Sequence, residues 1–387
     1  MKKGWQTKSL GDLCDVIGGG TPPKDKPAFY SGEIPWATVR DMRKDVITET
    51  EFQITKAAVK SSATNIIPSG NVVIATRVGL GKVCLTGQDT AINQDLRGIV
   101  PRSDKALVVR YLYWWLKSIA DVIVAEGTGA TVQGVKLPFV KSLQIPVPPL
   151  AEQQRIVGVL DEAFEGLATA KANAEKNLQN ARALFESHLQ SVFTQRGKGW
   201  VEKLLGDVCE TTQGVQIPKN LHFKSPGENR RRYLYISDFD HDENLKYVDD
   251  IFPKKRVTEN DLIVVNTGAT AGKIFRGIDG VLSNNLFKVT LNQGIDADFL
   301  YYFVTSSLFK EHQKKIVKGT ANPHMGHENF KSTPVNIPPL DVQLETATKL
   351  DDLREETQRL ARIYERKLAA LAELKKSLLH QAFTGEL

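Results

Sequence analysis

The chain contains two copies of one long sequence pattern, and this repetition limits the folds open to it. Residues 10–14 (Leu-Gly-Asp-Leu-Cys) recur 195 positions later as residues 205–209 (Leu-Gly-Asp-Val-Cys), and the Pro-Pro-Leu stretch at 148–150 recurs 190 positions later at 338–340. Solenoids repeat every ~20–50 residues, so this much longer period predicts two copies of a domain followed by a helix. Two similar modules on one chain also indicate a pseudo-twofold protein that meets its partner at two places.

Length and composition are those of an intracellular globular protein. The 387 residues suffice for two or three domains. The N-terminus has no apolar segment of the secretory type, and the longest apolar run, 107–119, is interrupted by Arg110 and Lys117. Of the three cysteines, Cys14 and Cys209 are equivalent in the repeat, which indicates small apolar core residues and no disulfide framework. We therefore expect a cytoplasmic protein.

The net charge is +6, and its distribution along the chain is uneven. Residues 1–150 carry a net charge of +6 and residues 197–340 of +2, whereas the segments 151–196 and 341–387 each carry −1. Positive charge that gathers in the two globular segments fits a polyanionic partner such as nucleic acid. Solubility alone would also explain a charge of this size, so charge leaves both explanations open.

The sequence divides into four segments. Segments 1–150 and 197–340 are globular: β-rich runs at 71–76 and 261–266 predict strands, and aromatic-rich stretches at 110–116 and 298–304 predict helices whose aromatics belong to the core. Segments 151–196 and 341–387 are predicted to be long helices, since each follows a proline pair that ends the preceding structure. The expected fold class is α+β, with two similar mixed α/β domains joined by two long helices.

Apolar residues in both helical segments recur at alternating steps of three and four, the spacing of a coiled-coil seam. In the first helix these residues are Leu160, Phe164, Leu167, Ala170, Ala174, Leu178, Ala181, Phe185, Leu189 and Val192, and in the second they are Leu350, Leu353, Thr357, Leu360, Tyr364, Leu368, Leu371, Leu374, Leu378 and Ala382. A helix of this length would be ~65 Å long, which favours pairing of the two helices as an antiparallel coiled coil. The alternative is an amphipathic helix that lies on its own domain. Gly158 and Gly166 are expected to weaken the first helix near its start.

Several apparent catalytic motifs do not meet the requirements of their chemistry. Residues 268–274 resemble a phosphate-binding loop, but the glycine spacing is short by one and Ile274 replaces the hydroxyl residue that would reach Mg²⁺. This stretch and its counterpart at 79–83 are expected to be strand-connecting turns, each with an exposed lysine. His324 and His327 have no carboxylate or cysteine companions, so a pair of loop residues is favoured over a metal site. We expect no catalytic residue, no metal and no cofactor in this chain.

The stronger signals are those of nucleic-acid contact. A flexible glycine turn at 18–20 with nearby lysines and an aromatic residue followed by arginines suit contact with phosphates and base edges. So do the Asn-Gln and Asn-Asn pairs at 93–94 and 284–285, which are predicted to be equivalent in the two copies. The candidate DNA-contact residues are Thr21, Lys24, Lys26, Trp36, Arg40, Arg43, Arg77, Lys82, Asn93 and Gln94 in the first copy, and Lys219, Arg230, Arg231, Arg232, Ser237, Asn266, Lys273, Asn284 and Asn285 in the second. For each residue alone, a solvated loop or a structural turn cap is the alternative. The two copies differ most in these stretches, as expected if similar scaffolds read different sequences.

With these features the chain resembles the specificity subunit of type I restriction-modification enzymes over nearly its whole length. The resemblance lies in the Gly-Gly-Gly-Thr-Pro stretch at 18–22, Ile-Pro-Trp at 34–36, the two Pro-Pro-Leu helix starts, Glu-Gln-Gln-Arg at 152–155 and the final Phe-Thr-Gly-Glu-Leu. The second helix start departs from this pattern, because it has Asp341-Val342-Gln343-Leu344 in place of the Glu-Gln-Gln of the first. We expect the departure to alter helix capping or subunit contact there.

The resemblance implies a fold and a set of partners. Segments 1–150 and 197–340 would be target-recognition domains, each of which reads one half of an asymmetric, bipartite site in double-stranded DNA. The antiparallel helices would set the gap between the halves and bind two methyltransferase subunits. Motor-nuclease subunits would complete the complex. S-adenosylmethionine, ATP and Mg²⁺ are then expected on the partner subunits and not on this chain.

Two other functions remain open at this point. A self-contained DNA-modifying enzyme would need a cofactor loop or a cluster of catalytic acids, and would carry a bound cofactor when purified. An architectural protein that bridges DNA without sequence choice would bind random duplexes equally well and would need similar contact loops in both copies.

Overall fold

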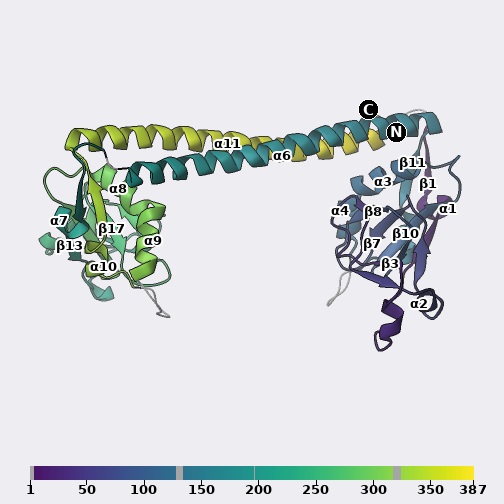
Figure 1. Cartoon of the computed structure of the whole chain (residues 1–387), viewed down its shortest axis with the longest axis horizontal. Helices are drawn as coiled ribbons and strands as arrows, with labels where there is room; N and C mark the ends of the chain where they lie inside the picture. Colours follow the sequence, from purple (N-terminus) through teal and green to yellow (C-terminus); the bar gives the residue numbers. More distant parts are fainter. Residues whose placement is uncertain (1–3, 128–133, 196, 317–323) are drawn as a thin grey trace. The chain divides into compact units, whose positions relative to one another are not determined.

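We describe the protein from a computed structural model, which defines residues 4–127, 134–195, 197–316 and 324–387 (Figure 1). By their contacts the residues form two compact units: unit 1 comprises Met1–Ala174 with Arg366–Leu387, and unit 2 comprises Glu175–Glu365. The contacts thus group part of each long helix with each globular part, whereas the four-segment division was drawn at the proline pairs of the sequence.

Unit 1 contains two β-sheets and a short ribbon in its described residues. The first sheet has the strand order β2 (Cys14–Gly18), β10 (Leu96–Pro101), β7 (Val72–Ala75), β8 (Val83–Thr86), β4 (Val46–Ile47), and the second has the order β5 (Phe52–Ile54), β3 (Ile34–Ala37), β9 (Thr90–Ile92), β6 (Asn65–Ile67). The ribbon pairs β1 (Gln6–Ser9) with β11 (Gln144–Val147). The helices of this part are α1 (Leu10–Leu13), η1 (Pro27–Tyr30), α2 (Lys56–Lys60), α3 (Val109–Ser118), α4 (Ala120–Ala125) and α5 (Leu137–Ser142).

Unit 2 repeats this arrangement. Its sheets have the orders β13 (Cys209–Gln213), β20 (Leu286–Leu291), β17 (Leu262–Val265), β18 (Ile274–Arg276) and β15 (Tyr247–Asp249), β14 (Arg230–Leu234), β19 (Gly280–Leu282), β16 (Arg256–Val257). The ribbon pairs β12 (Val201–Leu204) with β21 (Pro334–Ile337). The helices are α7 (Leu205–Val208), η2 (Lys219–Leu221), η3 (Ile236–Phe239), η4 (Pro253–Lys255), α8 (Ala297–Thr305), α9 (Ser307–Ile316) and α10 (His327–Lys331).

The strand registers show which residues of the two units are equivalent. Trp36 pairs with Ala91 between parallel strands β3 and β9, and Tyr233 pairs with Val281 between parallel strands β14 and β19. The predicted strands at 71–76 and 261–266 are confirmed as β7 and β17, the central strands of the two first sheets. Within the described residues, unit 1 adds the edge strand β4, for which unit 2 has no counterpart.

The predicted core helices are also confirmed. Tyr111, Tyr113, Trp114 and Trp115 of α3 are buried against the first sheet of unit 1, and Phe299, Tyr302 and Phe303 of α8 are buried in unit 2. Aromatic side chains of this size remove a large apolar area from water, which explains why one short helix organises each core.

The two long helices α6 (Leu150–Thr194) and α11 (Leu340–Thr384) have 45 residues each and begin directly after their proline pairs, one residue before the predicted starts. Gly158 and Gly166 do not interrupt α6. All ten predicted seam residues of α6 are buried or half-buried, and so are those of α11 except Leu374, which is 47% exposed. The period of three and four therefore predicted the buried face correctly.

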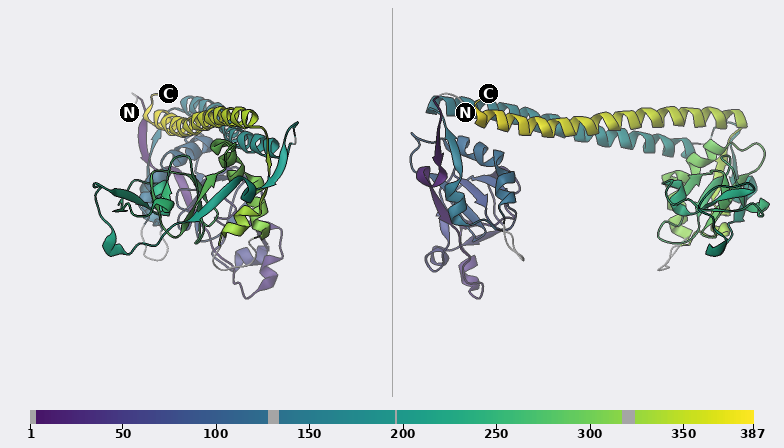
Figure 2. Two further views of the ribbon diagram at one scale, coloured as in Figure 1. Left: turned by 90° about the vertical axis from the view of Figure 1, so that its left-hand side faces the viewer. Right: turned by 180° about the vertical axis from the view of Figure 1, so that it is seen from behind.

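In each unit the helix segments lie side by side and run antiparallel (Figure 2). In unit 1, Arg155 near the start of α6 donates to the carbonyl of the last residue, Leu387, at 2.7 Å. In unit 2, Arg182 near the end of α6 forms an ion pair with Glu365 of α11 at 2.7 Å. Pairing of the helices is thus confirmed within each unit, and the alternative of a helix that lies on its own domain alone is excluded. A pseudo-twofold relation between the units stays a prediction.

A buried glutamine fixes the start of each long helix. Gln153 is fully buried; its Oε1 accepts from the backbone N–H of Val108, and its Nε2 donates to the carbonyls of Ala106 and Pro148 at 3.1 and 2.9 Å. Gln343 does the same in unit 2: it accepts from the N–H of Asp296 and donates to the carbonyls of Gly294 and Pro338. The expected change in capping at the second helix start was therefore wrong, because the residue that makes the junction is the same in both copies.

Candidate functional site

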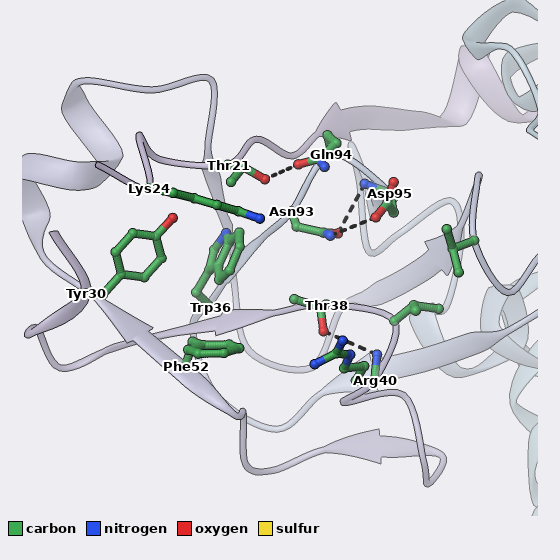
Figure 3. A pocket seen from close by; sticks show the side chains of 12 residues that line it. Thr21, Lys24, Tyr30, Trp36, Thr38, Arg40, Phe52, Asn93, Gln94 and Asp95 are labelled. Carbon is green, nitrogen blue, oxygen red and sulfur yellow. Dashed lines mark hydrogen bonds between the residues drawn. The ribbon is translucent and has the colours of Figure 1, made fainter. Parts of the chain in front are cut away.

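A recess in unit 1 brings together many of the predicted contact residues (Figure 3). Its volume is about 640 Å³. The rings of Tyr30, Trp36 and Phe52 gather at one end, and Gln94 and Asp95 lie at the other. Six predicted residues line it, namely Thr21, Lys24, Trp36, Arg40, Asn93 and Gln94. Aromatic walls with amide, hydroxyl and cationic groups around them match the chemistry of nucleotides, which present a flat apolar ring, polar edges and a phosphate.

The glycine turn beside this recess packs closely against a neighbouring backbone segment, whereas the sequence predicted a flexible turn. A Cβ atom at Gly19 would lie 2.0 Å from the carbonyl oxygen of Asn93, and one at Gly214 would lie 2.0 Å from that of Ser283. The glycines are thus required by close approach of two backbone segments, in the same way in both units. Gly19 and Gly214 therefore belong to the scaffold that positions the neighbouring side chains.

Trp36 also belongs to this scaffold. It is 6% exposed, and its indole N–H donates to the carbonyl of Gly20 at 3.1 Å. The equivalent Tyr233 donates its hydroxyl to the carbonyl of Val215 at 2.7 Å. In both units an aromatic residue of the second sheet therefore holds the glycine turn, and Trp36 presents only part of its ring to the recess.

The turn that follows β3 is held by one carboxylate, and the turn after β14 is built in the same way. Asp41 accepts from the backbone N–H of Thr38 at 2.7 Å, and Asp238 accepts from that of Tyr235 at 2.7 Å. The residue before each aspartate, Arg40 or Ser237, is exposed. The same turn therefore presents an arginine in unit 1 and a serine in unit 2.

The predicted equivalence of Asn93-Gln94 with Asn284-Asn285 is wrong by one residue. Asn93 donates its backbone N–H to Ala37 at the end of β3, whereas in unit 2 it is Ser283 that donates to Leu234 at the end of β14. Gln94 is thus equivalent to Asn284. The amide residues look alike in the sequence, but their register is set by the pairing of distant strands.

The buried side-chain amides of Asn93 and Asn266 form hydrogen bonds within their own loops. Each side chain is 6% exposed; Asn93 donates to Asp95 at 3.0 Å, and the Asn266 side chain accepts from the hydroxyl of Thr267 at 3.2 Å. Thr267 also donates to Asn285 at 3.4 Å. The structure therefore places Asn93 and Asn266 as internal turn residues, while Gln94, Asn284 and Asn285 are exposed or border the recess.

The lysines of the two strand-connecting turns are exposed, as the sequence predicted. Lys82 follows β7 and approaches the carbonyl of Val39 at 3.4 Å, whereas Lys273 follows β17 and forms an ion pair with Asp240 at 2.8 Å. Both lysines thus reach the loop that carries Arg40 or Ser237.

The remaining predicted cations of unit 1 lie around the recess or close to it. Arg43 donates its Nε to the carbonyl of Arg40 at 2.9 Å, Lys26 lies 5.4 Å from the ring of Phe29, and Arg77 lies 3.5 Å from Asp95. In unit 2, Lys219 lies exposed in η2. It follows the glycine turn at the same distance as Lys24 does in unit 1.

The three consecutive arginines of β14 are engaged by carboxylates of the same unit. The ion pairs are Arg230–Asp249 (3.8 Å), Arg231–Asp250 (2.7 Å), Arg231–Asp279 (2.8 Å), Arg232–Asp238 (3.3 Å) and Arg232–Asp242 (2.8 Å). The guanidinium of Arg230 also lies 3.4 Å from the ring centroid of Phe223. A polyanion that contacts these arginines must therefore compete with aspartates that already bind them.

Asp250 lies at the centre of this network. Burial acts to raise the pKa of its carboxyl, but hydrogen bonds from Arg256 and Arg231 outweigh burial and hold that pKa below its ordinary value. Asp250 is thus ionised at neutral pH and keeps Arg231 in place.

Sequence reasoning did not find several residues of the recess and its counterpart. Tyr30 donates its hydroxyl to the carbonyl of Pro22 at 2.8 Å, and His222 contacts the equivalent carbonyl of Ile217 at 3.0 Å. Phe52 joins the recess through the pairing of β5 with β3. No local pattern marks these residues, because each depends on contacts between distant segments.

The described residues contain no group of three or more His, Cys, Asp or Glu side chains that could hold a metal ion. No described helix is long and apolar enough to cross a membrane. The two histidines are separate: His324 is exposed, while His327 begins α10, contacts Thr211 Oγ1 at 2.7 Å and Gln213 Oε1 at 2.8 Å, and stacks on Phe287 with a centroid distance of 4.4 Å.

Acidification is expected to destabilise unit 2 through His327. Desolvation and the nearby charge of Lys331 lower the pKa of its imidazole below the ordinary value of 6.5. Because the unfolded chain then binds a proton more readily than the folded one, stability is complete above about pH 6.5 and falls as the pH drops through the two pKa values. The measurement is the melting temperature of unit 2 between pH 7.5 and 5, where His327→Gln should show a shallower fall. An equal slope in the variant and the parent chain would contradict this role, and His188→Gln, at an exposed position of α6 in the same unit, is the control.

Comparison with known proteins yields matches over nearly the whole chain. Residues 2–178 and 197–365 each match the family described as Type I restriction modification DNA specificity domain. The type I restriction enzyme MjaVIII specificity subunit of Methanocaldococcus jannaschii is 31% identical, with 99% of this chain and 93% of the relative covered. The MjaIX specificity subunit of the same organism is 24% identical over 100% of this chain and 94% of the relative. A solved structure that describes complex assembly and conformational transition of the type I R-M system has a similar fold, with a TM-score of 0.76 at 18% identity, covering 100% of this chain and 99% of that one.

Proposed function

The chain belongs to the type I restriction-modification DNA specificity family, and from this premise we propose that each unit reads one half of a bipartite site in double-stranded DNA. The family makes the chain a DNA sequence-recognition subunit that is not itself catalytic, with DNA and methyltransferase as its partners.

One observation supports the division into two half-sites. The units share the glycine turn, the aromatic residue that holds it and the aspartate-held turn, yet the exposed residues on this common scaffold differ: Arg40 is replaced by Ser237, and Gln94 by Asn284. A protein that bridged DNA without sequence choice would have no need for such differences. Side chains that vary on a constant scaffold are what the reading of two different sequences requires.

The long helices are proposed to set the gap between the two half-sites and to bind two methyltransferase subunits. Support comes from their length of 45 residues and from the antiparallel pairing found in each unit. Motor-nuclease subunits would join this complex. S-adenosylmethionine, ATP and Mg²⁺ are proposed to bind to the partner subunits, since the described residues of this chain offer neither a phosphate loop nor a metal-ligand cluster.

The test is single-molecule sequencing of genomic DNA from a host that expresses the chain with its methyltransferase subunit. We expect a new bipartite motif with one methyladenine in each half and a gap of fixed length. A host that expresses the methyltransferase subunit alone is the control. If the complex assembles and the methyltransferase is competent, but no motif appears, the recognition role proposed for the two units is wrong.

A further inference from the structure

We infer that Arg40 and Ser237 occupy one equivalent specificity-determining position in the two units, and that Arg40 recognises a guanine in the half-site of unit 1. This inference rests on the proposed function and adds to it the residue that distinguishes the two half-sites. The turn that carries this position borders the recess in unit 1, is held by an equivalent aspartate in both units, and presents a different exposed side chain in each.

The scaffold of the turn is fixed by backbone contacts in both units. In unit 1 the carboxylate of Asp41 accepts from the N–H and the hydroxyl of Thr38 and from the N–H of Glu51, and Arg43 donates to the carbonyl of Arg40. A side chain on such a turn starts from a defined place, which is a requirement for reading one base pair.

In unit 2 the equivalent turn is held as firmly. Asp238 accepts from the N–H of Tyr235, and the carbonyl of Ser237 accepts from the N–H groups of Asp240 and His241 at 3.1 and 2.9 Å. Arg232 adds an ion pair to Asp238. At the exposed position of Arg40 unit 2 has the hydroxyl of Ser237, which can bond to any base, and at the exposed position of Arg43 it has the carboxylate of Asp240.

The side chain of Arg40 is available for contact. Its side chain is 71% exposed and lines the recess, and its ion pair with Glu51 is long, at 3.4 Å between Nη1 and Oε2. An exposed pair of this kind contributes little and is easily exchanged for a better partner. A guanidinium offers two parallel donors, which match the O6 and N7 acceptors of guanine in the major groove.

The neighbouring cations help to distinguish residues that suit phosphate contacts from residues that suit base contacts. Lys24 and Lys219 follow the glycine turns, and Lys82 and Lys273 follow the strand-connecting turns, so both units retain these lysines. Residues that both copies share suit phosphate contacts, which carry no sequence information, whereas residues that differ suit base contacts. By this criterion Arg40 belongs to the second group.

The experiment selects preferred duplexes from a random-sequence DNA library with the complex of the full chain and its methyltransferase subunit, and sequences the bound fraction. Arg40→Ser should reduce discrimination at one G·C position of one half-site by roughly 5- to 150-fold, the equivalent of about 1–3 kcal/mol. All other positions should keep their preference. Ser237→Arg should change the preference at one position of the other half-site only.

The matched control is Arg102→Ser. Arg102 is 51% exposed, pairs with Asp15 in the same unit and is not among the residues that line the recess, so its loss should leave the motif unchanged. Assembly of each variant with the methyltransferase subunit confirms its fold. An unchanged motif in Arg40→Ser or Ser237→Arg overturns the inference. So does a uniform loss of affinity with a smaller salt dependence, which would identify Arg40 as a phosphate contact. If the parent chain selects no bipartite motif, the proposed function itself has failed.

Discussion

Replacing Gln153 by leucine is expected to destabilise unit 1 by about 3 kcal/mol or more. Its side chain is fully buried and makes three hydrogen bonds to backbone groups, from Val108 and to Ala106 and Pro148. Leucine fills a similar volume but bonds to none of them, and each buried polar group left without a partner costs about 1–3 kcal/mol. Because these groups lie at the start of α3 and of α6, the expected effect is release of the long helix from its globular part.

The control for this prediction is Gln154→Leu, the same change one residue later at an exposed position. The measurement is hydrogen exchange of the Val108 amide and of the first turn of α6, together with the melting temperature. Local exchange is needed because a chain with two compact units does not unfold in one two-state step. Protection at Val108 that survives in Gln153→Leu, or is lost equally in Gln154→Leu, would show that the junction does not depend on this side chain.

The geometry of this junction could be predicted only in part from the sequence. The second helix start differs from the first at two of the three positions that were compared, and by resemblance alone it was expected to behave differently. The hydrogen bonds of Gln343 repeat those of Gln153, so the one position that the two starts share decides the geometry. Sequence shows that a residue is retained, but its burial and its partners depend on loops about 47 positions away.

The elements that depend on local periodicity were predicted well. The seam of α6 and α11, the core aromatics of α3 and α8 and the central strands β7 and β17 follow from spacing within a few residues. Each of these features is encoded by its own segment and needs no knowledge of its neighbours.

The recess depends on contacts between distant segments, and for that reason it was only partly predicted. Six candidates meet there, but Tyr30 and Phe52 were missed because nothing near them in the chain marks them. The glycine turn was taken for a flexible loop, although its backbone lies against residues 92–93. The arginines of β14 were expected to be available, whereas five ion pairs to aspartates engage them, and charge counted along a sequence does not reveal such pairing.

Shortening both long helices is expected to shorten the gap of the recognised DNA site and to leave both half-sites unchanged. Deletion of residues 175–181 from α6 and 359–365 from α11 removes two turns from each helix and keeps the period of the seam. Seven residues at about 1.5 Å each correspond to about 10 Å, or roughly three base pairs at about 3.4 Å each. The half-sites should persist because the deletion lies outside the turns and the recess that are proposed to read bases.

The methylation motif of the deletion variant provides the measurement, and a variant of full length provides the control. In the control, exposed residues of the same two stretches are replaced by alanine while the seam residues Leu178, Ala181, Leu360 and Tyr364 remain, so that the helices keep their full length. Because three base pairs also turn the half-sites about the DNA axis by roughly 100°, methylation by the deletion variant should be slower. An original gap in the deletion variant would mean that the helices do not set the spacing. An altered half-site would mean that base reading extends into the helices. The proposal that the units read bases and the helices set only the gap would then be wrong.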